Sequence, residues 1–215
     1  QQLGDGQTLT ETFTVKAADG TTSSVTVTIN GTNDVAVISS SGTTGSVTED
    51  AGVSAGQIST GGTLSVADTD AGQAGFQAQP GTNGAYGTFT LAADGTWTYS
   101  ADNSQTAIQQ LGDGQTLTET FTVKAADGTT SSVTVTINGT NDSAVISSSG
   151  TTGSVTEDAA VSGGQISTGG TLSVSDTDAG QAVFQAQPGT NGAYGTFTLA
   201  ADGTWTYSAD NSQAA

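Results

Sequence analysis

Several residue types that usually carry chemistry are missing from this chain. It contains no cysteine, histidine, methionine or arginine, and its only cationic side chains are Lys16 and Lys124. The absence of cysteine excludes disulfides and thiolate chemistry. The absence of histidine leaves few groups for general acid or base catalysis. Each acidic group also recurs in every copy of the repeat described below, which suits a structural element better than a single active site, and we predict that the chain is not an enzyme.

Positive charge is equally scarce. The 215 residues include 20 acidic side chains and carry a formal charge of -18. Almost nothing here would neutralise a phosphate backbone, so nucleic acid is not an expected partner. No apolar run is long enough to span a bilayer, so membrane insertion is not expected either. Hydrophobic residues make up only 33%, but β-branched and aromatic residues recur regularly, which argues against disorder.

The sequence is a tandem repeat. Gln1–Gly6 returns as Gln109–Gly114, an offset of 109 − 1 = 108 residues. Residues 1–107 and 109–215 differ at six positions only: Val35/Ser143, Gly52/Ala160, Ala55/Gly163, Ala67/Ser175, Gly75/Val183 and Thr106/Ala214. Near-identity of this kind indicates an array of like modules.

The seams of the repeat suggest module boundaries. We expect residues 1–40 to be the C-terminal part of one repeat, 41–148 a complete repeat and 149–215 the N-terminal part of the next. On this division the chain carries two incomplete modules. We expect it to be a window on a continuous fibre, or else a subunit in which residues 1–40 of one copy complete residues 149–215 of another by strand donation.

Within one module the pattern predicts an all-β fold. Strands are expected at 45–48, 63–66, 74–79, 86–91, 96–99, 116–125 and 132–138, and residues 144–147 either close this module or begin the next. Ala92–Gly95 and Ala126–Thr129 are hairpin turns between alternating strands, and residues 102–111 contain at most a helical turn. About seven short strands with frequent turns predict a β-sandwich of immunoglobulin-like or cadherin-like type. Trp97 and Tyr99 share one face of a strand, so we place them in the core rather than on a sugar-binding platform.

The acidic residues near the seams are the candidate functional site. Calcium takes six to eight oxygen ligands and tolerates irregular geometry. The ion would also relieve repulsion between clustered carboxylates. We predict that one joint uses Asp34, Glu49, Asp50, Asp68 and Asp70, and the next Asp142, Glu157, Asp158, Asp176 and Asp178. The alternative is that these residues only form turns and solvated linkers, which we favour for Asp94, Asp102, Asp113, Asp127, Asp202 and Asp210.

The order of motifs resembles a known family. VTED, GTLSVADTDAG, YGTFTLAADGTWTYSADN and FTVKAADGTTSSVTVTINGTND stand in the order typical of the VCBS repeat, found in large bacterial surface proteins and RTX-type adhesins exported by type I secretion. The resemblance covers the whole 108-residue unit and implies calcium-dependent modules strung into extracellular fibres that support adhesion or biofilm. The expected partners are neighbouring repeats or further copies. The alternative is an adhesin module that itself binds a carbohydrate or cell-surface ligand.

Overall fold

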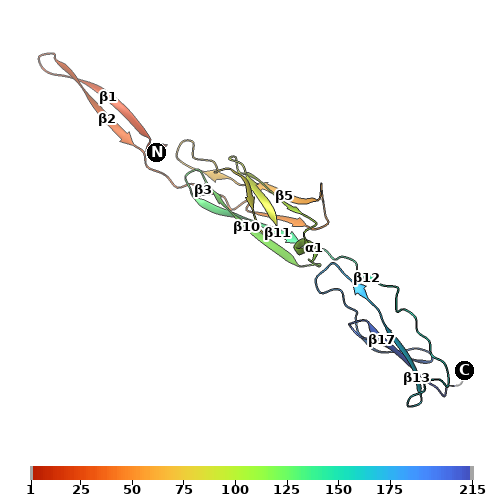
Figure 1. The fold of residues 1–215 in the computed structure, drawn as a ribbon. Coiled ribbons are helices and arrows are strands. Elements are labelled where there is room, and N and C mark those ends of the chain that lie inside the picture. The colour runs from red at the N-terminus through yellow and green to blue at the C-terminus, as the bar shows by residue number, and fades with distance from the viewer. Residues whose placement is uncertain (1, 214–215) are drawn as a thin grey trace. The chain divides into compact units, whose positions relative to one another are not determined.

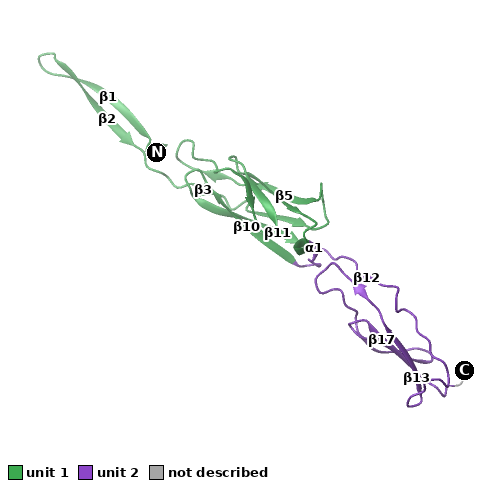
Figure 2. Cartoon of the chain, in the orientation of Figure 1, with its two compact units in different colours: residues 1–108, 116–138 green, residues 109–115, 139–215 purple. Residues whose placement is uncertain are grey.

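The computed structural model describes residues 2–213 and contains almost only β-structure (Figure 1). Strands account for 48% of the residues and helix for 2%, which confirms the predicted all-β class. The chain divides into two compact units, residues 1–108 with 116–138 and residues 109–115 with 139–215 (Figure 2). Residues 109–115 thus lie with the second unit although the residues on either side of them belong to the first.

The chain begins with an isolated hairpin. Strands β1 (Thr8–Lys16) and β2 (Thr22–Asn30) pair along their full length and form a two-stranded sheet. All eighteen strand residues are exposed, including the apolar side chains of Phe13 and Val25. Its sequence nevertheless alternates apolar and polar residues, as expected for a hairpin with one buried face.

The middle of the chain forms one complete sandwich. A three-stranded sheet has the order β10-β11-β4, and a four-stranded sheet has the order β5-β9-β8-β7. The elements are β3 (Val37–Ile38), β4 (Thr44–Thr48), β5 (Gln57–Thr63), β6 (Val66–Ala67), β7 (Gln79–Asn83), β8 (Gly87–Leu91), β9 (Thr96–Asp102), α1 (Thr106–Gln109), β10 (Thr116–Lys124) and β11 (Thr130–Asn138). Strand β4 pairs parallel with β11 and β10 pairs antiparallel with it.

An aromatic cluster fills the space between these two sheets. Phe89 stacks on Phe121 from the opposite sheet at 4.8 Å between ring centroids, and on Trp97 at 5.8 Å. The Trp97 indole N–H donates to the Gly42 carbonyl at 2.8 Å. Each large side chain buried here contributes roughly 1.5–3 kcal/mol. Trp97 and Tyr99 are fully buried, as predicted.

One acidic side chain lies inside this core. Glu119 accepts hydrogen bonds from the Tyr99 hydroxyl and, at 3.0 Å, from the Tyr86 backbone N–H. Burial, followed by the neighbouring Glu119 carboxylate, raises the pKa of Tyr99 well above the ordinary tyrosine value. The phenol therefore stays a hydrogen-bond donor, and its bond to Glu119 joins β9 of one sheet to β10 of the other.

The third part of the chain contains only one side of the sandwich. Its elements are β12 (Val145–Ile146), β13 (Gln165–Thr171), β14 (Val174–Ser175), β15 (Gln187–Asn191), β16 (Gly195–Leu199) and β17 (Thr204–Asp210). A four-stranded sheet has the order β13-β17-β16-β15 and repeats the β5-β9-β8-β7 sheet. Residues 152–156, which repeat the sequence of β4, are not in a strand in this part.

Three strands differ from those predicted. The strand expected at 63–66 is interrupted, because β5 ends at Thr63 and β6 holds only Val66–Ala67. Residues 74–78 were expected in a strand, but the strand is β7, which includes Pro80. Proline is tolerated there because β7 is an edge strand with an irregular register between Gln79 and Thr82. Strand β5 was missed because Gly61 and Gly62 interrupt its pattern; a Cβ on Gly62 would approach the Trp97 ring to 3.0 Å.

Two short strand pairs link residues before the predicted boundaries to residues after them. Strand β3 pairs with β6, and β12 pairs with β14. Val37 and Ile38 therefore belong to the module that follows them, although the expected boundary was at residue 41. Residues 145–146 likewise begin the third module rather than close the second.

Candidate metal sites at the two seams

The structure repeats one arrangement at both junctions of the repeat. We call the group formed by residues 2–4, 31–34 and 68–73 the first seam, and the group formed by 110–112, 139–142 and 176–181 the second seam. Each group combines a loop that precedes a hairpin, the linker that follows that hairpin, and an acidic turn of the next module. Each seam lies within a single compact unit.

The acidic turn is a short Asp-x-Asp loop that follows a two-residue strand. The Asp68 carboxylate accepts the backbone N–H of Asp70 at 2.8 Å, and Asp176 accepts that of Asp178 at 2.9 Å. These bonds are typical of an Asx turn. They turn the second aspartate inward, and both Asp70 and Asp178 are only 2% exposed.

The linker is bonded directly to that inner aspartate. The Asp34 backbone N–H donates to Asp70 Oδ2 at 2.8 Å, and the Asp142 N–H donates to Asp178 Oδ2 at 3.0 Å. The Gln181 side-chain amide donates to Asp178 Oδ2 as well, at 2.9 Å. The second oxygen of each inner carboxylate takes no part in these bonds.

The loop before the hairpin completes the arrangement with backbone carbonyls. The Gln2 carbonyl accepts from Ala71 N–H, and the Gln110 carbonyl accepts from Ala179 N–H, both at 3.0 Å. A Cβ on Gly31 would lie 2.4 Å from the carbonyl oxygens of Leu3 and Gly4, so only glycine lets the linker approach these oxygens so closely. In the second seam Gly139 lies in the same way against Leu111 and Gly112.

Three buried carboxylate oxygens at the seams make no hydrogen bond: Asp68 Oδ2 and Asp70 Oδ1 in the first seam, and Asp178 Oδ1 in the second. An ionised oxygen that is buried without a partner is costly. An ion that binds oxygen ligands would remove that cost. The donor set, with carboxylates and backbone carbonyls and no nitrogen or sulfur, therefore fits a hard cation such as calcium.

The side chains alone do not form a complete metal cage. Among residues 2–213, no group of three or more acidic side chains converges closely enough to hold an ion. In each seam the two carboxylates of the Asp-x-Asp turn lie close together. The linker aspartate takes part through its backbone N–H. The remaining oxygens near the turn belong to the main chain of the preceding loop.

The first predicted ligand set does not assemble at one place. Glu49 N–H donates to the Asn138 carbonyl at 3.0 Å, which places Glu49 at the C-terminal end of β11. Ala36 N–H donates to Asp127, just before the N-terminal end of β11, at 2.9 Å. Because β11 has nine residues, these ends lie roughly 26 Å apart. Asp34, Asp68 and Asp70 thus gather at one end of the module and Glu49 and Asp50 at the other.

The second predicted set divides in the same way. The Asp158 N–H donates to Asn211 at 2.9 Å, just as Asp50 N–H donates to Asn103 at 3.0 Å. Glu157 and Asp158 therefore lie by the end of β17, whereas Asp142, Asp176 and Asp178 form the second seam. The prediction grouped residues that are close in sequence. In the structure, however, β4 and the residues 152–156 that repeat its sequence lead away from the Asp-x-Asp turn.

Five of the other aspartates behave as turn formers. Asp94, Asp102, Asp127, Asp202 and Asp210 each accept the backbone N–H two residues on, at 2.8 to 2.9 Å. These N–H bonds stabilise the ionised carboxylate and, with a further N–H bond from Ala36 at Asp127, lower the pKa of all five groups. None of these five carboxylates has a buried oxygen without a hydrogen bond, in contrast to Asp68, Asp70 and Asp178 at the seams.

Sequence reasoning missed one component of the seams. The Gln-Leu-Gly-Asp-Gly loop was interpreted only as a turn around Asp113, but its value to the seam lies in the carbonyls of Gln110, Leu111 and Gly112. The exact recurrence of this loop at both junctions was the one feature of the sequence that could have indicated its part in the seams. Carbonyl groups carry no side-chain signature, so their direction was not predictable.

The comparisons with known proteins concern the fold of the complete module. Residues 33–139 match the family model described as bacterial cadherin-like domain, and these limits agree with the strand pairing that begins at β3. A comparison with curated proteins finds no match. No helix among the described residues is long and apolar enough to cross a membrane.

Solved structures with some similarity include cadherin ectodomains. The chain matches protocadherin PcdhgB3 EC1-4 at 11% identity and a TM-score of 0.42, covering 95% of this chain and 57% of that one. It matches the protocadherin GammaB4 extracellular domain at 14% and 0.41, covering 95% and 31%. A Ca²⁺-stabilized adhesin of an Antarctic bacterium matches at 18% and 0.24, covering 95% and 49%. The chain thus spans little more than half, or less, of these proteins.

Proposed function

We propose that this chain is part of a structural extender, a fibre body made of cadherin-like modules whose joints are stiffened by calcium. The observation that carries the proposal is the repeated seam, where a buried aspartate with an unpartnered oxygen binds the linker and lies against the preceding loop. Near-identical modules suit reach and stiffness, because selective recognition would require some copy to differ.

The residues present suggest how the ion would be held. We propose Asp68 and Asp70 as the carboxylate ligands of the first seam, and Asp176 and Asp178 as those of the second, with Asp34 and Asp142 contributing from the linkers. Glu49 with Asp50, and Glu157 with Asp158, are proposed ligands at the opposite ends of their modules. Calcium, when bound, would supply positive charge to these carboxylates.

Fixing the linker is the mechanical consequence of such a site. The chain leaves a hairpin through Gly31 or Gly139, and the next few residues decide how freely the following module swings. A cation held by the turn and the linker would restrict those backbone torsions. With 20 acidic and only two basic side chains, the chain also has a strong electrostatic reason to bind divalent cations.

The test compares unfolding temperatures with and without calcium. Extracellular calcium modules bind at about 10⁻⁴–10⁻³ M, so about 10 mM calcium is expected to raise the unfolding temperature by on the order of 10 °C over the chelated protein. The double variant Asp70→Asn with Asp178→Asn keeps an oxygen to accept the linker N–H but removes the buried charge. It should lose this response and be at least as stable as the unmodified chain in chelator.

The matched control is Asp94→Asn with Asp202→Asn, which removes the same charge from two turns outside the seams. This control should keep the full calcium response. If the seam variant lost equal stability with and without calcium, or if the unmodified chain did not respond at all, the carboxylates would be turn formers only.

The wider setting is also a proposal. The module order resembles the VCBS repeat, and we propose a secreted or surface-attached bacterial fibre that supports adhesion or biofilm, exported by type I secretion. The alternative of direct sugar binding finds little support in the complete module. Its Trp97 and Tyr99 are buried, Tyr86 is half-buried, and no aromatic side chain between residues 33 and 139 is fully exposed.

A further inference from the structure

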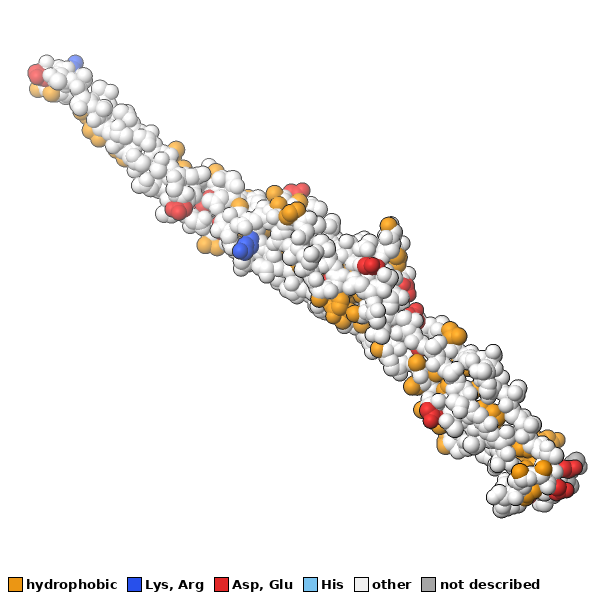
Figure 3. Space-filling view, in the orientation of Figure 1, with side chains coloured by type: hydrophobic (Ala, Val, Ile, Leu, Met, Phe, Trp, Pro, Cys, Tyr) orange, Lys and Arg blue, Asp and Glu red, His pale blue; other side chains and the backbone are white. Residues whose placement is uncertain are grey.

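The β1–β2 hairpin exposes an apolar face that is buried elsewhere in the same molecule. Residues 8–30 are identical in sequence to residues 116–138, which form β10 and β11. Phe13 is 53% exposed while Phe121 is 4% exposed, and Val25 is 50% exposed while Val133 is fully buried. Figure 3 shows hydrophobic side chains along the hairpin surface. The hairpin is thus complete in itself but lacks the sheet on which its sequence packs.

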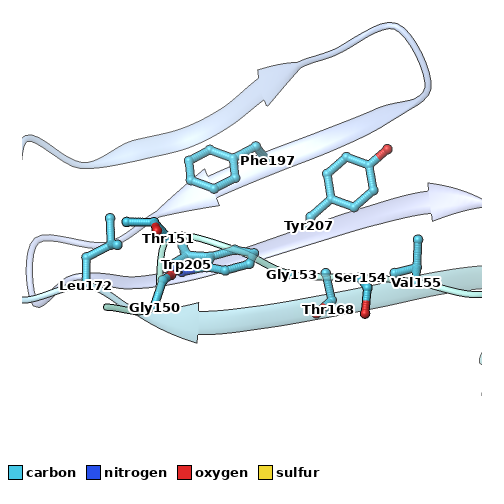
Figure 4. Close-up of a pocket in the computed structure, with 10 residues that line it drawn as sticks. All are labelled: Gly150, Thr151, Gly153, Ser154, Val155, Thr168, Leu172, Phe197, Trp205 and Tyr207. Atoms are coloured by element: carbon cyan, nitrogen blue, oxygen red, sulfur yellow. Dashed lines mark hydrogen bonds between the residues drawn. The ribbon is translucent and has the colours of Figure 1, made fainter. Parts of the chain in front are cut away.

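The third module exposes the complementary face. A cavity of about 510 Å³ opens over its four-stranded sheet, with Phe197, Trp205 and Tyr207 on its wall (Figure 4). These residues are the counterparts of Phe89, Trp97 and Tyr99, which are buried in the complete module, where Phe121 contacts Phe89 and Tyr99. The same face that is closed at residues 33–139 is therefore open at residues 149–213.

The backbone of the third module also differs from that of the complete module beside this open face. Residues 44–48 form β4 and pair parallel with β11, with Thr44 opposite Thr134 and Val47 opposite Ile137. Residues 152–156 have the same sequence but are not in a strand. The simplest cause is that the third module has no partner equivalent to β11 among the described residues.

We propose that the β1–β2 hairpin of one copy packs on the open face of residues 149–213 of a second copy and completes its sandwich. The internal copy fixes the register: Thr26 would lie opposite Thr152 and Ile29 opposite Val155. Phe13 would stack on Phe197, and Glu11 would accept the Tyr207 hydroxyl and the Tyr194 N–H.

A second copy is the occupant because this interface already exists within each chain. The same two sequences meet in the complete module, where the buried Glu119 accepts hydrogen bonds from Tyr99 and Tyr86. Since the hairpin and the face are different surfaces, the contact is heterologous and leaves one of each free, so assembly continues head to tail. The contact is apolar and does not depend on calcium at the seams.

A pair of glycines gives a specific steric test. A Cβ on Gly84 would lie 2.0 Å from Glu119 Oε1 and 2.9 Å from the Phe121 ring. At the equivalent Gly192 the nearest atom is the Gly195 carbonyl oxygen at 3.4 Å. A side chain at position 192 is therefore harmless to the third module but blocks an incoming hairpin.

The experiment measures assembly of the whole 215-residue chain by sedimentation velocity and light scattering, at fixed calcium and physiological ionic strength. The unmodified chain should form species that lengthen with concentration. Phe13→Asp and Gly192→Val should each remain monomeric. Their controls, Thr14→Asp and Gly189→Val, should assemble as the unmodified chain does, because Thr122 is exposed and Gly81 makes only an ordinary contact in the complete module.

Mixing the two blocked variants gives the decisive result. Phe13→Asp retains an open face and Gly192→Val retains a hairpin, so the mixture should form a one-to-one dimer and nothing longer. If the unmodified chain remained monomeric, the proposal would be overturned. A hairpin that closed on the open face of its own chain would give that result. Assembly that Gly192→Val does not affect would also overturn it, because hairpins would then be pairing with each other.

Discussion

At the scale of single residues, the same side chain has different roles in different copies. Glu11 and Glu119 occupy identical positions in identical hairpins. Glu11 is exposed, but Glu119 is 6% exposed and accepts two hydrogen bonds in the core. Nothing in the local sequence distinguishes them. The sheet packed against each hairpin decides whether the carboxylate is a surface charge or a core acceptor.

Replacing Glu119 tests that role. Glu119→Val leaves the Tyr99 hydroxyl and the Tyr86 N–H buried without an acceptor, and each unpaired group costs about 1–3 kcal/mol. We expect the free energy of unfolding of the complete module to fall by roughly 2–4 kcal/mol in a urea titration.

Glu11→Val is the matched control and should change the stability of the complete module by less than about 0.5 kcal/mol when the chain is dilute. An equal loss for the two variants would show that the effect comes from strand propensity rather than from the buried hydrogen bonds.

At the scale of elements, regular alternation made the hairpins predictable. Strands β8 and β9, and β10 and β11, lie where their apolar periodicity and Asp-Gly turns placed them. Strand β5 was not predictable, because its two glycines make room for Trp97 and tertiary packing is invisible in a local pattern. The predicted position of β7 was wrong because Pro80 was interpreted as the end of a strand, whereas it lies within an edge strand.

A glycine after β7 tests the packing of the two sheets. A Cβ on Gly84 would overlap Glu119 and Phe121, so Gly84→Ala should reduce the stability of the complete module by about 1–3 kcal/mol. Gly192→Ala makes the same change at a position that no hairpin faces among the described residues. In dilute solution this variant should therefore unfold with the same free energy as the unmodified chain. Calorimetry of both variants checks this difference, and similar effects at the two positions would contradict the packing described here.

At the scale of the whole molecule, the repeat and the all-β class were predictable from sequence, whereas the grouping of the candidate ligands was not. Asp34 and Glu49 are only fifteen residues apart in the chain. They nevertheless lie at opposite ends of β11, because the residues between them, which include β4 alongside the C-terminal half of β11, lead from one end of that strand to the other. The Asp-x-Asp turns lie beside the linkers, since a strand pairing carries each turn back to its linker.

The central claim is that calcium stiffens the joint, and a distance distribution across the second seam tests it most directly. The chain has no cysteine, so Thr122→Cys with Thr204→Cys gives two unique sites for spin labels on exposed strand residues of neighbouring modules. Labelled chains carrying Phe13→Asp would be measured dilute, in calcium and in chelator. We predict a narrow distance distribution in calcium that broadens on chelation, and no such change when Asp178→Asn is added. A distribution of the same width in both conditions would contradict the account.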